Sequence, residues 1–172
     1  MLPTLSFIVL QIDRFTTFTG RTLAPLLGLM LLVTVAVVVL RYGLNAGTQA
    51  LQEIVVYLHA TVFMLGFAYT LKADGHVRVD IFYQKLGDRG RAAVNCCGST
   101  FLLLPMCGFI FFSSLDYVGF AWQLKEGSAE PGGLPFIYVL KTLIPASAAL
   151  LFVQGTAELL RNLIVLLGDR RG

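Results

Sequence analysis

Four apolar stretches take up most of the sequence and decide what this chain can fold into. They cover residues 22–40, 54–71, 92–115 and 134–160, and within them only His59, Lys141 and Glu158 are histidine or charged. A helix needs about 18–20 apolar residues to cross a hydrocarbon layer of about 30 Å, and every stretch reaches that length. The whole chain is 56% hydrophobic and 13% charged, against about 25% charged in soluble domains. We therefore expect an all-α membrane protein with four transmembrane helices.

The polar residues around these stretches set the predicted boundaries. We expect spans at about residues 22–43, 51–72, 92–117 and 134–160, within one membrane domain of residues 22–167. A loop of residues 73–91 separates the second span from the third, and residues 168–172 form a basic C-terminal tail.

Residues 1–21 form an N-terminal segment of a different character. Apolar side chains recur there at helical spacing around Gln11, Asp13 and Arg14, which indicates an amphipathic helix lying in the membrane interface. A helical extension of the first span is the alternative. Gly20 and Arg21 favour a break before the first span, and with it the interfacial helix.

Lysine and arginine are distributed unevenly between the two sides of the predicted spans. Ten fall on the side of the N-terminal segment, the central loop and the C-terminal tail, and two on the other side. Short loops rich in these residues stay in the cytoplasm, so we expect both termini and residues 73–91 to be cytoplasmic. The ten are Arg14, Arg21, Lys72, Arg78, Lys85, Arg89, Arg91, Arg161, Arg170 and Arg171, and the two are Arg41 and Lys125.

The central loop begins with the run GHVRVD, residues 75–80. Gly75 is expected to end the second span, because glycine commonly stops helices. Asp80 is placed to cap a short amphipathic helix at the cytoplasmic surface. His76 precedes that helix, and Arg78 is placed to bind the open carbonyls of the second span, Asp80 or a lipid phosphate. The alternative is that these charges only fix the topology.

Three charged residues lie at similar depth near the outer ends of three different spans. They are Glu53, Asp116 and Lys141. An unpaired ion within the hydrocarbon costs about 3 kcal/mol on insertion scales, so we expect an ion-paired cluster that clamps the helices together. Glu53 is the expected partner of Lys141, and solvation in the interface is the alternative for Asp116. A proton relay through these residues is the competing interpretation.

No pattern of catalytic or metal-binding residues is visible in the sequence. His59 and His76 would lie about 25 Å apart on one helix, so they cannot share a metal ion, and an interhelical contact is the expected role of His59. Cys96, Cys97 and Cys107 fall in one span without a C-x-x-C pair and are expected to be small buried thiols. The sequence therefore predicts neither an enzyme nor a bound cofactor, metal or nucleic acid.

The last outer loop is polar, acidic and rich in glycine and proline, which indicates an exposed and partly rigid segment. The loop includes Lys125, Glu126, Glu130, Pro131, Gly132 and Gly133.

Two runs of the sequence resemble a known family. QEIVVYLHATVFMLGFAYTLKADGHVRVDIFYQKL, with Glu53, Gly66 and residues 75–80, resembles the small membrane subunit of tripartite ATP-independent periplasmic (TRAP) transporters, the DctQ-like family. The run PGGLPFIYVLKTLIP, residues 131–145 with Lys141, is similar to the entry into the last helix of that family. The resemblance covers about residues 20–165.

The resemblance implies a scaffold subunit in the bacterial inner membrane. Its partners would be a large multi-span permease subunit, which carries the substrate and Na⁺ sites, and a periplasmic substrate-binding protein. The small subunit would brace the permease subunit and help dock the binding protein. The candidate contact residues for the binding protein lie in the last outer loop: Lys125, Glu126, Glu130, Pro131, Gly132 and Gly133. A stand-alone proton-coupled exporter or exchanger using Glu53 is the alternative, and a haem or quinone anchor using His59 is a third reading.

Overall fold

The computed structural model describes residues 2–75, 83 and 86–168, and over these residues the chain is helical with short connections. Helix α1 (Leu2–Val38) continues into a π-helical turn (Val39–Gly43), and α2 (Gln49–Lys72) follows. Helix α4 (Asp88–Gly98), a second π-helical turn (Ser99–Leu103) and α5 (Leu104–Gln123) form one long rod, and α6 (Ile137–Gly168) ends the fold. Within the described residues, four helices are long and apolar enough to cross a membrane, so the predicted four-span architecture is confirmed.

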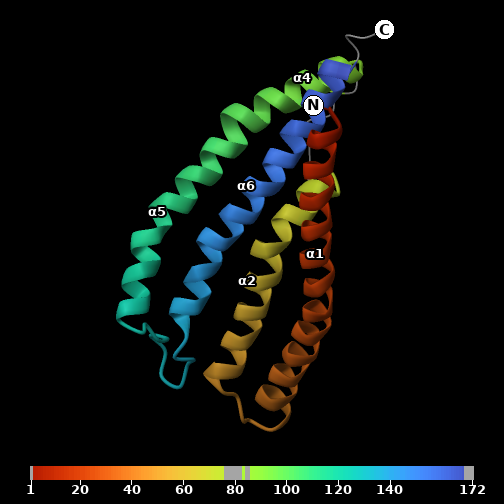
Figure 1. Cartoon of the computed structure of the whole chain (residues 1–172). Helices are drawn as coiled ribbons and strands as arrows, with labels where there is room; N and C mark the ends of the chain where they lie inside the picture. Colours follow the sequence, from red (N-terminus) through yellow and green to blue (C-terminus); the bar gives the residue numbers. More distant parts are fainter. Residues whose placement is uncertain (1, 76–82, 84–85, 169–172) are drawn as a thin grey trace.

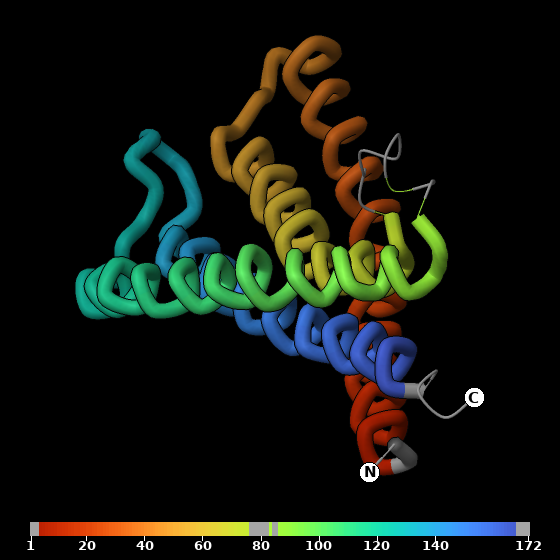
Figure 2. Tube along the Cα trace, turned by 90° about the horizontal axis from the view of Figure 1, so that it is seen from above, coloured from red at the N-terminus to blue at the C-terminus, as the bar shows by residue number. Residues whose placement is uncertain are grey.

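The helices form two hairpins that meet through α6. Figure 1 shows α5, α6, α2 and α1 side by side, with the connections of both hairpins at the same end. Helix α6 contacts α1, α2, α4 and α5. In its apolar 18-residue stretch 22% of the residues are buried, against 6% in the corresponding stretch of each other span. Viewed from above in Figure 2, the α4–α5 rod crosses α6 at an angle. Helix α6 is therefore the central helix of the fold.

The two ends of the bundle carry different features and are named accordingly. The termini end holds the start of α1, the end of α2, the start of α4 and the end of α6 (Figure 1). The hairpin end holds residues 44–48 and 124–136, which connect the helices of each hairpin. This arrangement places both ends of the described chain on one side, as four spans require, while the cytoplasmic orientation of that side stays a prediction.

Small residues make the contacts between helices, and large apolar residues point outward. The buried apolar side chains include Ala68, Ala121, Ala148 and Ala157, whereas Phe101 and many other large ones are exposed. Lipid provides no hydrophobic drive between helices, so close packing of small residues holds membrane helices together. The exposed apolar surface is what a lipid-embedded bundle requires.

Two glycines mark the closest helix crossings. A methyl group at Gly20 of α1 would clash with the ring of Tyr69 on α2, and one at Gly155 of α6 would lie 2.8 Å from Leu103. Glycine at these positions lets the backbones approach more closely than alanine would.

The expected break between an N-terminal helix and the first span is absent. Helix α1 runs through Gly20 and Arg21 without interruption, so the alternative of a helical extension holds. Gly20 leaves room for the ring of Tyr69 on α2, which a larger residue would clash with. A helix break inside a membrane would also leave backbone groups without hydrogen-bond partners. The helical run Thr4–Gly43 has 40 residues, about 60 Å at 1.5 Å per residue, or twice the hydrocarbon thickness. An interfacial location for its first half stays a prediction.

The other helices also extend past the predicted spans. The α4–α5 rod covers Asp88–Gln123, where the predicted third span has residues 92–117. Helix α6 covers Ile137–Gly168, where the predicted fourth span has residues 134–160. The second π-helical turn ends at Leu103, two residues before Pro105, whose missing N–H interrupts the regular hydrogen-bond ladder of the preceding turn. Helix length thus exceeds membrane thickness, and the predicted membrane boundaries stay predictions.

Helix α2 ends in a two-bond C-cap rather than at Gly75 itself. Asp74 takes the left-handed conformation (φ 55°), and its N–H donates to the Leu71 carbonyl at 3.2 Å. The Gly75 N–H donates to the Thr70 carbonyl at 2.9 Å, which completes the pattern of the Schellman motif. The residue in the left-handed conformation that stops the helix is therefore Asp74 and not the predicted Gly75. His76, Arg78, Asp80 and the central interfacial helix lie outside the described residues.

Candidate functional site

Glu53 fastens the connection of the second hairpin, residues 124–136, to α2. We call this connection the outer loop after its predicted side of the membrane. Its Oε2 accepts a hydrogen bond from the Leu134 N–H at 2.6 Å, and its Oε1 accepts one from the Ser128 hydroxyl. Ser128 in turn accepts the Glu130 N–H at 3.1 Å, and the Ser128 N–H donates to the Leu134 carbonyl at 2.9 Å. One carboxylate from the first hairpin thus organises the connection of the second.

Gly133 is required for this arrangement. A methyl group on Gly133 would collide with the side chains of Ser128 and Glu53. The neighbouring Gly132 has φ +77° with open space around it, a conformation that side chains other than glycine rarely adopt. Backbone shape and the Glu53 contacts therefore define the loop together.

Lys141 makes its ion pair with the outer loop and not with Glu53. Its Nζ lies 2.5 Å from Glu126 Oε2 and 4.1 Å from the centroid of the Tyr117 ring. The loop folds back over the start of α6, where the Tyr138 N–H donates to the Glu126 carbonyl at 3.4 Å. The predicted Glu53–Lys141 pair is therefore wrong, because the depth comparison between spans did not include a carboxylate from the loop.

Asp116 is the third member of the predicted cluster, and its side chain is exposed on α5. Although the neighbouring Tyr117 contacts Lys141, Asp116 itself is exposed on the surface of the bundle. The predicted three-residue cluster thus separates into a loop fastening at Glu53, an ion pair at Lys141 and an exposed carboxylate at Asp116.

Aromatic residues surround Lys125 at the start of the outer loop. Lys125 Nζ lies 4.8 Å from the ring centroid of Trp122 and 5.0 Å from that of Tyr138, and the Trp122 Nε1–H donates to Thr142 Oγ1 at 2.8 Å. Trp and Tyr are enriched at the boundary between lipid and water, and the position of that boundary on this chain stays a prediction. Of the predicted contact residues, Lys125, Glu130, Pro131 and Gly132 are exposed, while Glu126 and Gly133 are partly buried.

A polar network at the termini end was not anticipated from the sequence. Arg161 on α6 lies 2.7 Å from Asp13 Oδ2 on α1 and 2.5 Å from Glu158 Oε1. Gln154, which is fully buried, donates to Asp13 Oδ1 at 3.1 Å and accepts the Thr16 hydroxyl at 2.7 Å. These bonds join the first and last helices of the fold.

Helices α2 and α4 join the same network. Lys72 donates to the Asp13 carbonyl at 3.0 Å and to the Thr17 hydroxyl, while the Asn95 side-chain amide of α4 donates to Asn162 Oδ1 of α6 at 3.3 Å. A sequence signal for this seam exists in hindsight. Gln154, Glu158 and Arg161 recur at intervals of four and three residues in an otherwise apolar helix, which puts them on one face.

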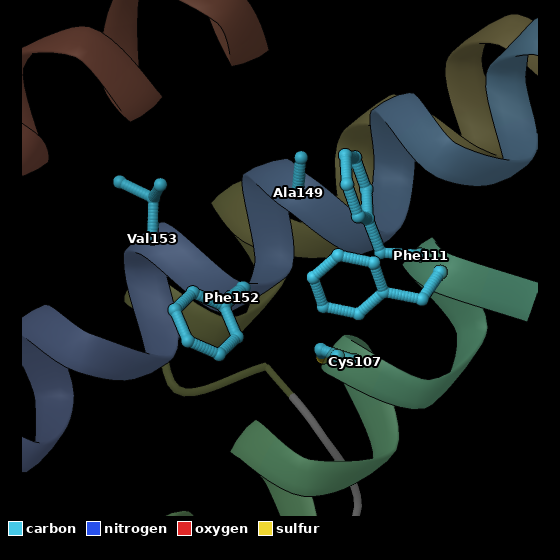
Figure 3. A pocket seen from close by; sticks show the side chains of 7 residues that line it. Cys107, Phe111, Ala149, Phe152 and Val153 are labelled. Atoms are coloured by element: carbon cyan, nitrogen blue, oxygen red, sulfur yellow. The ribbon is translucent and has the colours of Figure 1, made fainter. Parts of the chain in front are cut away.

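The cysteines differ in environment. Cys107 is buried, Cys96 is half-buried and Cys97 is exposed on the surface of α4, so the expectation of three buried thiols is wrong for Cys97. Cys107 lines a shallow apolar recess of about 280 Å³ between α5 and α6. Figure 3 shows Cys107 and Phe111 from α5 opposite Ala149, Phe152 and Val153 from α6. The recess is lined without charged or hydroxyl side chains, as expected for a surface in contact with lipid.

The described residues contain no group of three His, Cys, Asp or Glu side chains arranged to hold a metal ion. At the hairpin end, Glu53 holds the outer loop and Lys141 pairs with Glu126. At the termini end, Arg161 joins Asp13 and Glu158. The fold and these sites define the chain as an all-α, multi-pass membrane protein with structurally paired polar groups.

The sequence comparisons agree with that class. Residues 30–164 match the family of tripartite ATP-independent periplasmic transporters, DctQ component. A Haemophilus influenzae protein named as a TRAP transporter small permease protein is 29% identical over 110 residues, which cover 64% of this chain and 66% of that protein. The aligned part is thus slightly less than two thirds of that relative. No solved structure matches the chain. The chain belongs to the DctQ family, the small membrane subunits of TRAP transporters.

Proposed function

We propose that this chain braces the large permease subunit of a TRAP transporter in the bacterial inner membrane and presents its outer loop to a periplasmic substrate-binding protein. In this proposal the termini end is cytoplasmic, and the hairpin end faces the periplasm. Substrate and Na⁺ are bound by the permease subunit. The distribution of lysine and arginine supports the orientation.

The observation that carries the docking role is the fastening of the outer loop by Glu53. Both carboxylate oxygens bind the loop, at Ser128 and Leu134, so the exposed Glu130, Pro131 and Gly132 belong to a loop of defined shape. A preformed surface binds a partner with a smaller loss of conformational entropy than a mobile loop does. The engaged state of Glu53 also gives no support to a stand-alone exporter that would use its carboxylate for proton exchange.

The test is reconstitution into liposomes with and without the partners. Solute uptake should require this chain, the large permease subunit and the binding protein together, with no uptake by this chain on its own. The paired variants Glu130→Lys and Asp88→Lys reverse one exposed charge at opposite ends of the bundle. We expect Glu130→Lys to weaken the dependence on binding protein and Asp88→Lys to leave it unchanged. Uptake by this chain without partners would refute the proposal.

A further inference from the structure

One face of α2 carries an imidazole without a hydrogen-bond partner. His59 is exposed, and among the described residues its ring nitrogens receive and donate no hydrogen bond, while its ring stacks on Phe63 at 5.7 Å between centroids. At 1.5 Å per residue it lies about 15 Å from Gln49 and about 20 Å from Lys72. His59 is therefore near the middle of a membrane-spanning helix, where lipid provides no hydrogen-bonding group.

Two exposed hydroxyl groups, one on each of the other two outer helices, bond within their own helix. The Thr34 hydroxyl of α1 donates to the Met30 carbonyl at 2.7 Å, and the Ser113 hydroxyl of α5 donates to the Ile110 carbonyl at 3.4 Å. The His59 ring makes no such bond to its own helix or to any other described residue. His59 thus needs a partner from outside this chain.

The surroundings of His59 fit a closely packed helix. Val56 and Phe63, one turn before and after it, are 55% and 58% exposed. Gly66 lies two turns from His59 on the same face, and a methyl group added there would meet no atom within 4 Å. Glycine weakens a helix relative to alanine, and no packing contact among the described residues requires it at this position. We call Val56, His59, Phe63 and Gly66 the His59 face.

We propose that the His59 face docks against a membrane-spanning helix of the large permease subunit, which places a hydrogen-bonding side chain opposite His59 and its backbone close to Gly66. This inference rests on the proposed function, which supplies the partner. It adds which surface of the small subunit forms the interface and what chemistry the partner helix contributes. The apolar recess between α5 and α6 and the exposed surface of α1 remain in contact with lipid.

Photocrosslinking in membranes that contain the co-expressed complex tests the location. A photoreactive phenylalanine analogue replaces Val56 or Phe63 on the His59 face, and Leu31 on α1 or Phe109 on α5 as matched exposed controls. We expect adducts with the large subunit from positions 56 and 63, and lipid adducts or none from 31 and 109. Adducts with the large subunit from 31 or 109 instead, in a complex that purifies intact, would overturn this inference and leave the proposed function standing. Adducts between two copies of this chain would assign the face to a homodimer, and failure of any complex to purify would overturn both proposals.

Substitution of His59 tests the hydrogen bond. His59→Leu removes it and makes the surface more compatible with lipid, whereas His59→Gln keeps a donor and an acceptor. Hydrogen bonds between membrane helices are modest, so we expect His59→Leu to weaken association with the large subunit about three-fold or more. His59→Gln should retain most of the affinity, and Phe109→Leu on α5 should leave it unchanged. Equal affinities for the wild type and His59→Leu, with the isolated chain equally folded, would contradict the hydrogen bond.

Discussion

Arg161 on the last helix and Asp13 on the first form an ion pair at 2.7 Å, although 148 positions separate them in the sequence. Arg161 also binds Glu158, and Asp13 also binds the buried Gln154. The pair therefore belongs to a network in which every charged group has more than one partner. Such networks lose more than one bond when a single member is removed.

We expect Asp13→Ala to lower the free energy of unfolding by about 1–3 kcal/mol, since it leaves Arg161 and Gln154 with unmatched groups. The midpoint of thermal unfolding in detergent measures the loss. Asp116→Ala removes an equivalent carboxylate from an exposed position and should have little effect. Asp13→Ala combined with Arg161→Gln should lose less than the sum of the two single changes, and strictly additive losses would contradict the pair.

Glu53→Ala should release the outer loop. Hydrogen bonds to a charged group contribute about 1.5–3 kcal/mol, and this substitution removes two of them. Amide hydrogen exchange at Ser128 and Leu134 should therefore become faster, while exchange in the middle of α6 stays slow. Gln52→Ala, at the adjacent position, serves as the control. Unchanged exchange in the loop of the Glu53→Ala variant would show that backbone shape alone holds it.

The partner of Lys141 can be identified by a double-mutant cycle. Lys141→Met with Glu126→Gln should recover part of the stability that each single change loses, because the two groups form one ion pair. Lys141→Met with Glu53→Gln should be additive. Coupling in the second cycle and none in the first would restore the partner predicted from the sequence.

Gly20 and Gly28 on α1 should respond in opposite directions to alanine. Gly20→Ala places a methyl group against the Tyr69 ring, and overpacking of this kind typically costs about 1–3 kcal/mol. Gly28→Ala meets open space and should raise stability slightly through the better helix propensity of alanine. Thermal unfolding in detergent compares the two, and equal effects would contradict the crossing at Gly20.

Orientation can be measured by cysteine labelling in intact cells, in a variant whose three native cysteines are replaced by serine. Ala129→Cys should react with a membrane-impermeant thiol reagent, and Asp88→Cys should not. Ala129 is exposed in the outer loop, whereas a side chain at Gly127 would press on Pro135 at 3.3 Å. The reverse pattern would invert the proposed topology.

Much of the fold could be predicted because membrane spans depend on composition over long windows. The four helices follow from runs in which charge is nearly absent, and the end of the first helical run at Gly43 agrees with the predicted end of the first span. Continuity across Gly20 could not be predicted, because the reason for that glycine is Tyr69 on another helix. Composition describes each helix by itself, while a crossing depends on two.

The candidate site was harder to predict for a related reason. The sequence predicts an ion pair between Glu53 and Lys141, whereas the partners of Glu53 are a loop hydroxyl and a backbone N–H. Almost every residue has the same backbone N–H group, so a search of the sequence for opposite charges does not find such a partner. The pairing of Lys141 with Glu126 depends on how the loop folds over α6, and this path is set by Gly132, Gly133 and Glu53 together.

The central place of α6 has a consequence for the order in which the protein matures. Asp13 and Thr16 leave the ribosome before Gln154 and Arg161, the α6 residues that bind them. Until α6 inserts, the Asp13 carboxylate and the Thr16 hydroxyl of the first hairpin lack their partners from α6. Chains stalled before residue 150 should therefore stay sensitive to membrane proteases, and completion of the last helix should end that sensitivity in a single step.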